Sequence, residues 1–229
     1  MTAELLWKKR ITLILSGVLS TALVGLFILY AYFLTGVRVV ALDTSFYFLV
    51  STSTHVQAST HEITQGGGAG YFFDWENKEY VAYAVYLNEA DGQAVQTRVA
   101  ALDQNVMLLG LYADKLYLKT SKEKRNAEII KGAFTSLHGC IKVLNEEILR
   151  LLSNGTQESS KRVLEVLKKQ FAYLKAEYTS TFPKFSALCE QAEKSLVLML
   201  QEYVMVKNLR YLQCELSLSY IRLADNYSI

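Results

Sequence analysis

An apolar run without a single charge extends from Ile11 to Leu34 near the start of the chain. About 20 apolar helical residues cross the roughly 30 Å hydrocarbon core of a bilayer, so the run is long enough to be a transmembrane helix. Three basic residues (8–10) precede it, whereas only Arg38 follows it closely. The positive-inside rule then predicts a single-pass protein of the cytoplasmic membrane, with residues 1–10 in the cytoplasm and the rest outside it.

A cleaved signal peptide is the alternative interpretation, because small residues at 20–22 resemble a cleavage motif. The apolar run continues for a further twelve residues beyond that motif, which favours a lasting anchor in the lipid bilayer. Gly17, Thr21 and Gly25 are spaced by four, so they share one helix face on which two anchors can pack. Small residues are also common in membrane helices without such a role.

After a linker at 35–45, alternating apolar and polar positions with glycine-rich turns predict an α/β segment at 46–119. We expect helices at 55–65 and 88–102. The expected strands are 46–51, 71–75, 79–87 and a final one at either 106–111 or 115–119. This β-α-β-β-α-β order is typical of a small ferredoxin-like sheet with both helices on one face.

From residue 121 to the C-terminus, apolar residues recur at steps of three and four, which predicts amphipathic helices. The first ends at Ser153-Asn154-Gly155, the second covers 158–180, and Pro183 precedes a third at 184–223. Short connections between three such helices indicate an antiparallel three-helix bundle. The apolar stripes form its core or, in part, a surface for another protein. The expected fold class is therefore α+β: a transmembrane helix, a ferredoxin-like domain and a three-helix bundle.

Within the α/β segment, the residues from Glu79 to Asp91 (EYVAYAVYLNEAD) resemble the second half of a SPOR domain, in which an aromatic strand leads into an acidic helix start. The first half is similar too, with a strand, a Ser/Thr-rich loop, a helix and a glycine turn before the aromatic strand at Tyr71. Two family features differ here: Leu49 and Ser51 stand where the family has glutamine and glycine, and Ala84-Val85 replaces a glycine-proline pair.

The resemblance implies a βαββαβ module that binds peptidoglycan glycan strands lacking stem peptides, which gather at bacterial division septa and in spore envelopes. If the sheet has such a glycan face, alternating aromatic residues are the candidates because their rings can stack on sugars. An equally simple alternative is that half of them pack under the two helices. The candidates are Tyr47, Tyr71, Phe73, Tyr83 and Tyr86.

Charge balance and motif content argue against several classes of function. Lysine and arginine number 24 against 22 acidic residues, and this near balance argues against a nucleic-acid partner. No nucleophile elbow, phosphate loop or metal-ligand spacing is present, so we predict no catalytic residues, no metal and no cofactor. The three cysteines are expected to be buried apolar residues, although a disulfide between any two remains open: Cys140, Cys189 and Cys214.

Three functions follow from these patterns. The first is an extracytoplasmic cell-envelope protein whose SPOR-like module binds peptidoglycan and whose bundle contacts other envelope proteins. The second is a non-catalytic membrane scaffold with a degenerate SPOR-like fold. The third is an enzyme or ligand sensor, which requires a pocket between sheet and bundle lined by convergent polar groups.

Overall fold

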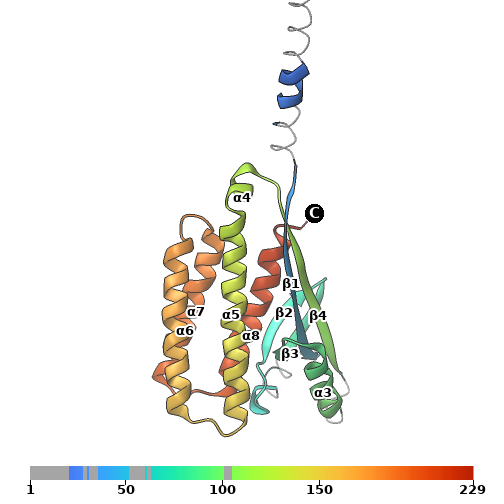
Figure 1. The fold of residues 1–229 in the computed structure, drawn as a ribbon. Coiled ribbons are helices and arrows are strands. Elements are labelled where there is room, and N and C mark those ends of the chain that lie inside the picture. Colours follow the sequence, from blue (N-terminus) through green and yellow to red (C-terminus); the bar gives the residue numbers. More distant parts are fainter. Residues whose placement is uncertain are drawn as a thin grey trace, which may run out of the picture.

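The structure is a computed structural model that describes residues 21–27, 30, 36–51, 60, 63–100 and 105–228. The chain is α+β, with one antiparallel four-stranded sheet lying against long helices (Figure 1). The strand order is β2-β3-β1-β4, so β1 lies between β3 and β4.

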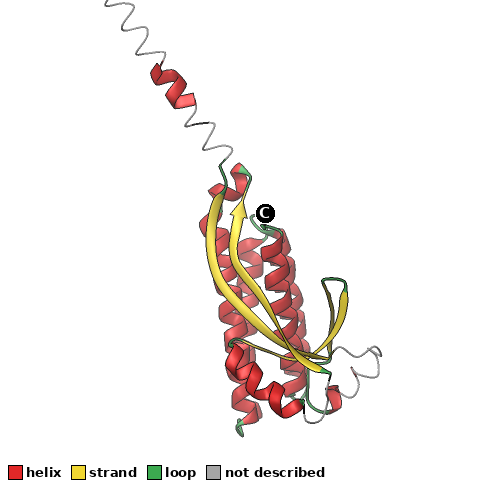
Figure 2. Ribbon diagram, turned by 90° about the vertical axis from the view of Figure 1, so that its right-hand side faces the viewer, coloured by secondary structure: helices red, strands yellow, loops and turns green. Residues whose placement is uncertain are grey.

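β1 (Arg38–Ser51) and β4 (Val106–Leu118) form a long ribbon that pairs from end to end, apart from an irregularity between Ala41 and Thr44. The hairpin of β2 (Tyr71–Trp75) and β3 (Lys78–Tyr86) joins the sheet at the C-terminal end of β1, where β3 pairs with residues 47–51 (Figure 2). Both long strands exceed their predicted lengths. The two stretches expected as alternative final strands belong to β4, because β1 offers a partner along its whole length.

Local signals explain where most helices begin. The side chain of Asn88 accepts a hydrogen bond from the Asp91 N–H at the start of α3, and Thr156 does the same for Ser159 in α6. Pro183 is the first residue of α7, where its missing N–H costs nothing. The helices are α3 (Glu89–Val99), α4 (Ser121–Arg125), α5 (Ala127–Leu152), α6 (Gln157–Tyr178), α7 (Pro183–Gln201) and α8 (Val206–Asp225).

Helices cover both faces of the sheet. Side chains alternate along β1, so Phe46 and Tyr47 point to opposite faces. The Phe46 ring packs edge-on against Tyr220 of α8, with centroids 5.4 Å apart. On the other face, Gly92 of α3 lies so close to β4 that an added Cβ would be 2.7 Å from Leu108 Cδ1. The long helices therefore cover the Phe46 face and α3 covers part of the Tyr47 face.

The sheet and the long helices share one cluster of buried hydrophobic residues, which continues from β1 through α5 to α8. Polar contacts tie the same elements together. Arg222 of α8 donates a 3.0 Å hydrogen bond to the Asp74 carbonyl of β2, and the Tyr117 N–H of β4 donates to the Tyr227 carbonyl at 2.7 Å. The helices thus complete the core of the sheet.

The predicted architecture is wrong in its helical part. The expected third helix at 184–223 is two helices, α7 and α8, separated at residues 202–205. Neither glycine nor proline marks this break in the sequence. The expected bundle is also not separate from the sheet, because α5 and α8 pack directly against it.

The predicted transmembrane helix at 11–34 is also corrected. Among the residues that the structure describes, no helix is both long enough and apolar enough to span a membrane. Much of the predicted span lies outside the described residues. The same holds for most of the helix expected at 55–65, of which residues 60 and 63–65 are described as helical.

Candidate functional site: a tyrosine face on the sheet

Two of the five predicted glycan-binding residues face the long helices. Phe73 of β2 is buried, and its ring centroid is 5.4 Å from that of Phe48 in β1. The Tyr71 ring packs edge-on against Tyr211 of α8, with centroids 5.0 Å apart. Both side chains therefore contribute to the packing between sheet and helices.

Two other candidates lie on the opposite face. Tyr47 of β1 and Tyr86 of β3 are directly opposite each other in the antiparallel ladder, so their side chains share one face. Tyr83 is an extra residue where the β1–β3 register shifts, and its carbonyl accepts a 2.7 Å hydrogen bond from Ala69. The five candidates consequently do not form one groove.

Tyr112 of β4, which sequence reasoning missed, joins the Tyr47 side of the sheet. Its ring is perpendicular to that of Tyr47 with centroids 6.1 Å apart, and it is 58% exposed. The ring leans over Gly110, where an added Cβ would lie 2.5 Å from the Tyr112 hydroxyl. The missing side chain at Gly110 thus makes room beside Tyr47. We call Tyr47, Tyr86 and Tyr112 the tyrosine face.

The hydroxyl groups of Tyr86 and Tyr112 are protonated at neutral pH. Burial raises the pKa of Tyr86. Partial burial, followed by the neighbouring Tyr47, Glu89 and Asp114, raises the pKa of Tyr112. A phenol hydroxyl both donates and accepts hydrogen bonds, and the two carboxylates add acceptors. The tyrosine face therefore combines exposed aromatic surface with hydrogen-bonding groups.

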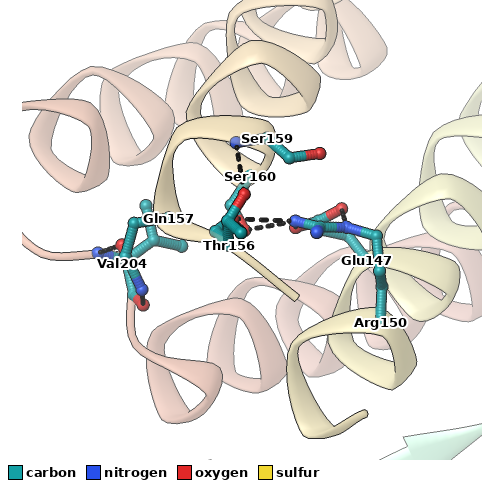
Figure 3. Close-up of polar contacts among 7 residues, drawn as sticks. All are labelled: Glu147, Arg150, Thr156, Gln157, Ser159, Ser160 and Val204. Carbon is teal, nitrogen blue, oxygen red and sulfur yellow. Dashed lines mark hydrogen bonds and ion pairs between the residues drawn. The ribbon is translucent and has the colours of Figure 1, made fainter. Parts of the chain in front are cut away.

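A second polar cluster lies at the turn between α5 and α6 (Figure 3). Glu147 is buried, and Arg150 donates to its two oxygens at 2.6 and 2.9 Å. Arg150 also donates to Ser160 Oγ at 2.7 Å and to the Thr156 carbonyl at 3.2 Å. Burial raises the pKa of Glu147, but hydrogen bonds from Arg150 and Ser160 outweigh burial and lower it overall. A carboxylate held ionised in this way is poorly suited to donate a proton.

The same cluster explains the break between α7 and α8. Gln157 Nε2 donates to the Val204 carbonyl at 2.8 Å, and Gln157 Oε1 accepts from the Val204 N–H at 2.9 Å (Figure 3). One side chain thus satisfies both backbone groups that a continuous helix would have satisfied. Together with the Arg150 contacts, this pair of hydrogen bonds fixes two turns at one end of the helices, which is a structural role.

The remaining predicted site consists of the small residues Gly17, Thr21 and Gly25. Gly17 lies outside the described residues, and Thr21 and Gly25 lie in the helical segment 21–27. A Cβ added at Gly25 would meet nothing within 4 Å. In the described ranges, no group of three His, Cys, Asp or Glu side chains is arranged to hold a metal ion.

Comparisons with protein-family models, with curated proteins and with solved structures found no match to this chain. The resemblance to SPOR domains therefore stays a prediction. Function has to follow from the geometry and chemistry of the surface.

Proposed function

We propose that this chain is a non-catalytic cell-envelope protein that binds glycan strands on its tyrosine face. The observation that carries the proposal is the edge-to-face pair of Tyr47 and Tyr112 on the sheet face away from the long helices, with Tyr112 more than half exposed. Such rings present apolar faces to sugar rings while their hydroxyls bond to sugar hydroxyls.

The surroundings of the pair support the same ligand class. Tyr47 and Tyr112 stand on neighbouring paired strands, so their positions are fixed before binding and little entropy is lost. The carboxylates of Glu89 and Asp114 near Tyr112 are acceptors for sugar hydroxyls. The SPOR-like sequence pattern narrows the ligand to peptidoglycan glycan strands without stem peptides.

Retention of the full chain on peptidoglycan sacculi tests the proposal. Sacculi treated with an amidase to remove stem peptides are compared with untreated sacculi. We expect retention on the treated material and about fivefold weaker binding for Tyr112→Ala, because a lost aromatic contact costs on the order of 1 kcal/mol. Tyr173→Ala on α6 is the matched control, since Tyr173 is 59% exposed and Tyr112 is 58% exposed.

Absence of retention for the unmodified chain would refute glycan binding. Equal losses for Tyr112→Ala and Tyr173→Ala would show that retention does not use the tyrosine face. Both variants change exposed residues, so circular dichroism should show unchanged folding in each.

One observation favours the scaffold function as the alternative. The long helices occupy the Phe46 face of the sheet, which removes Tyr71 and Phe73 from any glycan surface. Exposed apolar side chains on the outer helices, such as Val166 of α6 and Leu198 of α7, offer surface for protein partners. Crosslinking in cells that traps only the monomer would count against this alternative.

A further inference from the structure

A cleft of about 270 Å³ lies where the end of β3, α3, α5 and α8 meet. It is the kind of pocket between sheet and helices that the ligand-sensor hypothesis requires. Aliphatic side chains from α3 and α5 form much of its lining: Ala94, Val95, Ile148, Leu149 and Leu152. Leu149 and Leu152 are more than half exposed, so the apolar surface continues to the rim of the cleft.

One wall of the cleft is a strand edge. β3 pairs with β1 on one side as far as Tyr86, but with β2 on the other side only as far as Ala82. The Tyr83 carbonyl accepts from Ala69. Among the described residues, no strand pairs with the outer side of Ala84–Tyr86, and these residues line the cleft. An unpaired edge presents backbone N–H and C=O groups to an added strand.

The polar lining is positively charged. Arg98 of α3 and Arg210 of α8 both line the cleft, against one carboxylate, Asp91. Asp91 already accepts a 2.8 Å hydrogen bond from the Asn88 side chain. Arg210 donates from Nη1 to the Gly67 carbonyl at 2.8 Å, which orients its guanidinium group. Neither arginine takes part in an ion pair with a described residue.

Amide groups complete the wall. Gln213 of α8 is 1% exposed, and its Nε2 donates to Asn145 Oδ1 of α5 at 3.1 Å, so each side chain holds the other in place. The cleft therefore combines a free strand edge, aliphatic walls, fixed amides and two guanidinium groups.

We propose that this cleft binds the carboxyl terminus of an extended peptide. The peptide backbone adds to the free edge of β3, small apolar side chains occupy the aliphatic lining, and Arg98 and Arg210 bind the terminal carboxylate. Guanidinium groups suit this task because their planar donors match the two carboxylate oxygens. This site goes beyond glycan binding and does not depend on it.

Fluorescence anisotropy with the full chain tests the site. The probe is a fluorescein-labelled hexapeptide ending in Ala-Val-Ala with a free carboxylate, and the same peptide with a terminal carboxamide is the comparison. We expect the carboxylate form to bind about tenfold more tightly, or more, since charged hydrogen bonds contribute about 1.5–3 kcal/mol. Arg98→Gln should remove most of that difference, because Arg98 is exposed and its loss leaves the fold intact.

Two further variants separate the cleft from the rest of the surface. Ala94→Phe places a ring in the cleft without removing a charge, so it should abolish binding of both peptides. Arg162→Gln, on α6 and away from the cleft lining, should leave both affinities unchanged. Circular dichroism checks that each variant is folded.

Three results would overturn the proposal. These are equal affinity for the two peptides, no saturable binding of the carboxylate peptide up to millimolar concentration, and unchanged binding in Ala94→Phe. Displacement of the peptide by inorganic phosphate at equal concentration would also count against it, because it would show a plain anion site. None of these outcomes bears on retention by denuded sacculi, so failure here leaves the glycan proposal standing.

Discussion

Replacing Arg150 by methionine is expected to leave an ionised carboxylate buried at the turn between α5 and α6. The Glu147 side chain is 2% exposed, and both of its oxygens accept hydrogen bonds from Arg150. Methionine keeps the apolar stem but donates no hydrogen bond. Breaking a buried ion pair by removing one partner costs about 3–5 kcal/mol. Because the Arg150 side chain is 33% exposed, water weakens the pair, and we expect a loss of about 2–3 kcal/mol.

Urea unfolding followed by circular dichroism at neutral pH gives the free energy of unfolding of each variant. The matched control is Arg162→Met, which breaks an ion pair with Glu158 one turn away on α6. Both of those side chains are more than three-quarters exposed, so their pair should contribute no more than about 0.5 kcal/mol. The contrast between the two arginines isolates the effect of burial.

The double variant Glu147→Leu, Arg150→Met should lose less stability than Arg150→Met alone. Removing both partners leaves no charge to bury, and an apolar pair can replace a buried ion pair at little cost. A loss below about 0.5 kcal/mol for Arg150→Met would refute the reasoning. A double variant less stable than the single one would refute it as well.

The pH dependence gives a second check. In the unmodified protein the pKa of Glu147 is lowered on folding. Its contribution is therefore present above the unfolded carboxyl pKa of about 4.3 and is lost as pH falls through the lower folded value. Without Arg150, only the hydrogen bond from Ser160 opposes burial, so the pKa of Glu147 is higher in the variant than in the unmodified protein and protonation stabilises the variant. The stability gap between the two proteins should narrow as pH falls from neutral towards about 4. A constant gap would contradict a buried carboxylate.

Three further predictions concern other parts of the molecule. Gln157→Leu removes both hydrogen bonds to the Val204 backbone, so it should lower the free energy of unfolding by about 1–3 kcal/mol. It should also speed amide hydrogen exchange at residues 202–205, measured by mass spectrometry, and unchanged exchange would contradict the role of Gln157. Gly110→Ala should displace the Tyr112 ring and weaken retention on denuded sacculi, while the urea midpoint changes little because that ring is exposed. The three buried cysteines are Cys140, Cys189 and Cys214. Burial raises the pKa of each thiol, so maleimide should label them no faster than the folded protein opens to expose them. Rapid labelling of the folded protein would refute this prediction.

Features encoded by neighbouring residues were predictable from the sequence. The helix expected at 158–180 corresponds to α6, because Gly155 and Thr156 supply the stop and the cap locally. The start of α7 at Pro183 follows from the same kind of signal. The β2–β3 hairpin follows from two aromatic runs around a polar turn, where Glu76 and Asn77 adopt positive φ angles.

Features that depend on distant residues were not predictable. The break between α7 and α8 depends on Gln157, which lies 47 positions before Val204. No glycine or proline at 202–205 indicates that a helix ends there. The role of Tyr112 depends on β1, because β4 becomes one continuous strand only when a partner of equal length lies beside it. Period-two alternation placed the aromatics on two faces, but the helices that follow in the chain decide which face remains open.

The tyrosine face and the cleft meet at Tyr86, and this determines which variants are informative. Tyr86 is opposite Tyr47 in the sheet and also lines the cleft, so a change there would disturb both sites and distinguish neither. Tyr112 belongs to the tyrosine face and does not line the cleft, whereas Ala94 lines the cleft. Independent sites require that Tyr112→Ala weakens glycan retention but not peptide binding, and that Ala94→Phe does the reverse. If each variant weakens both, the two sites are coupled, either by one extended ligand that spans Tyr86 or by a shift of α3, which packs on β4 where Gly92 meets Leu108.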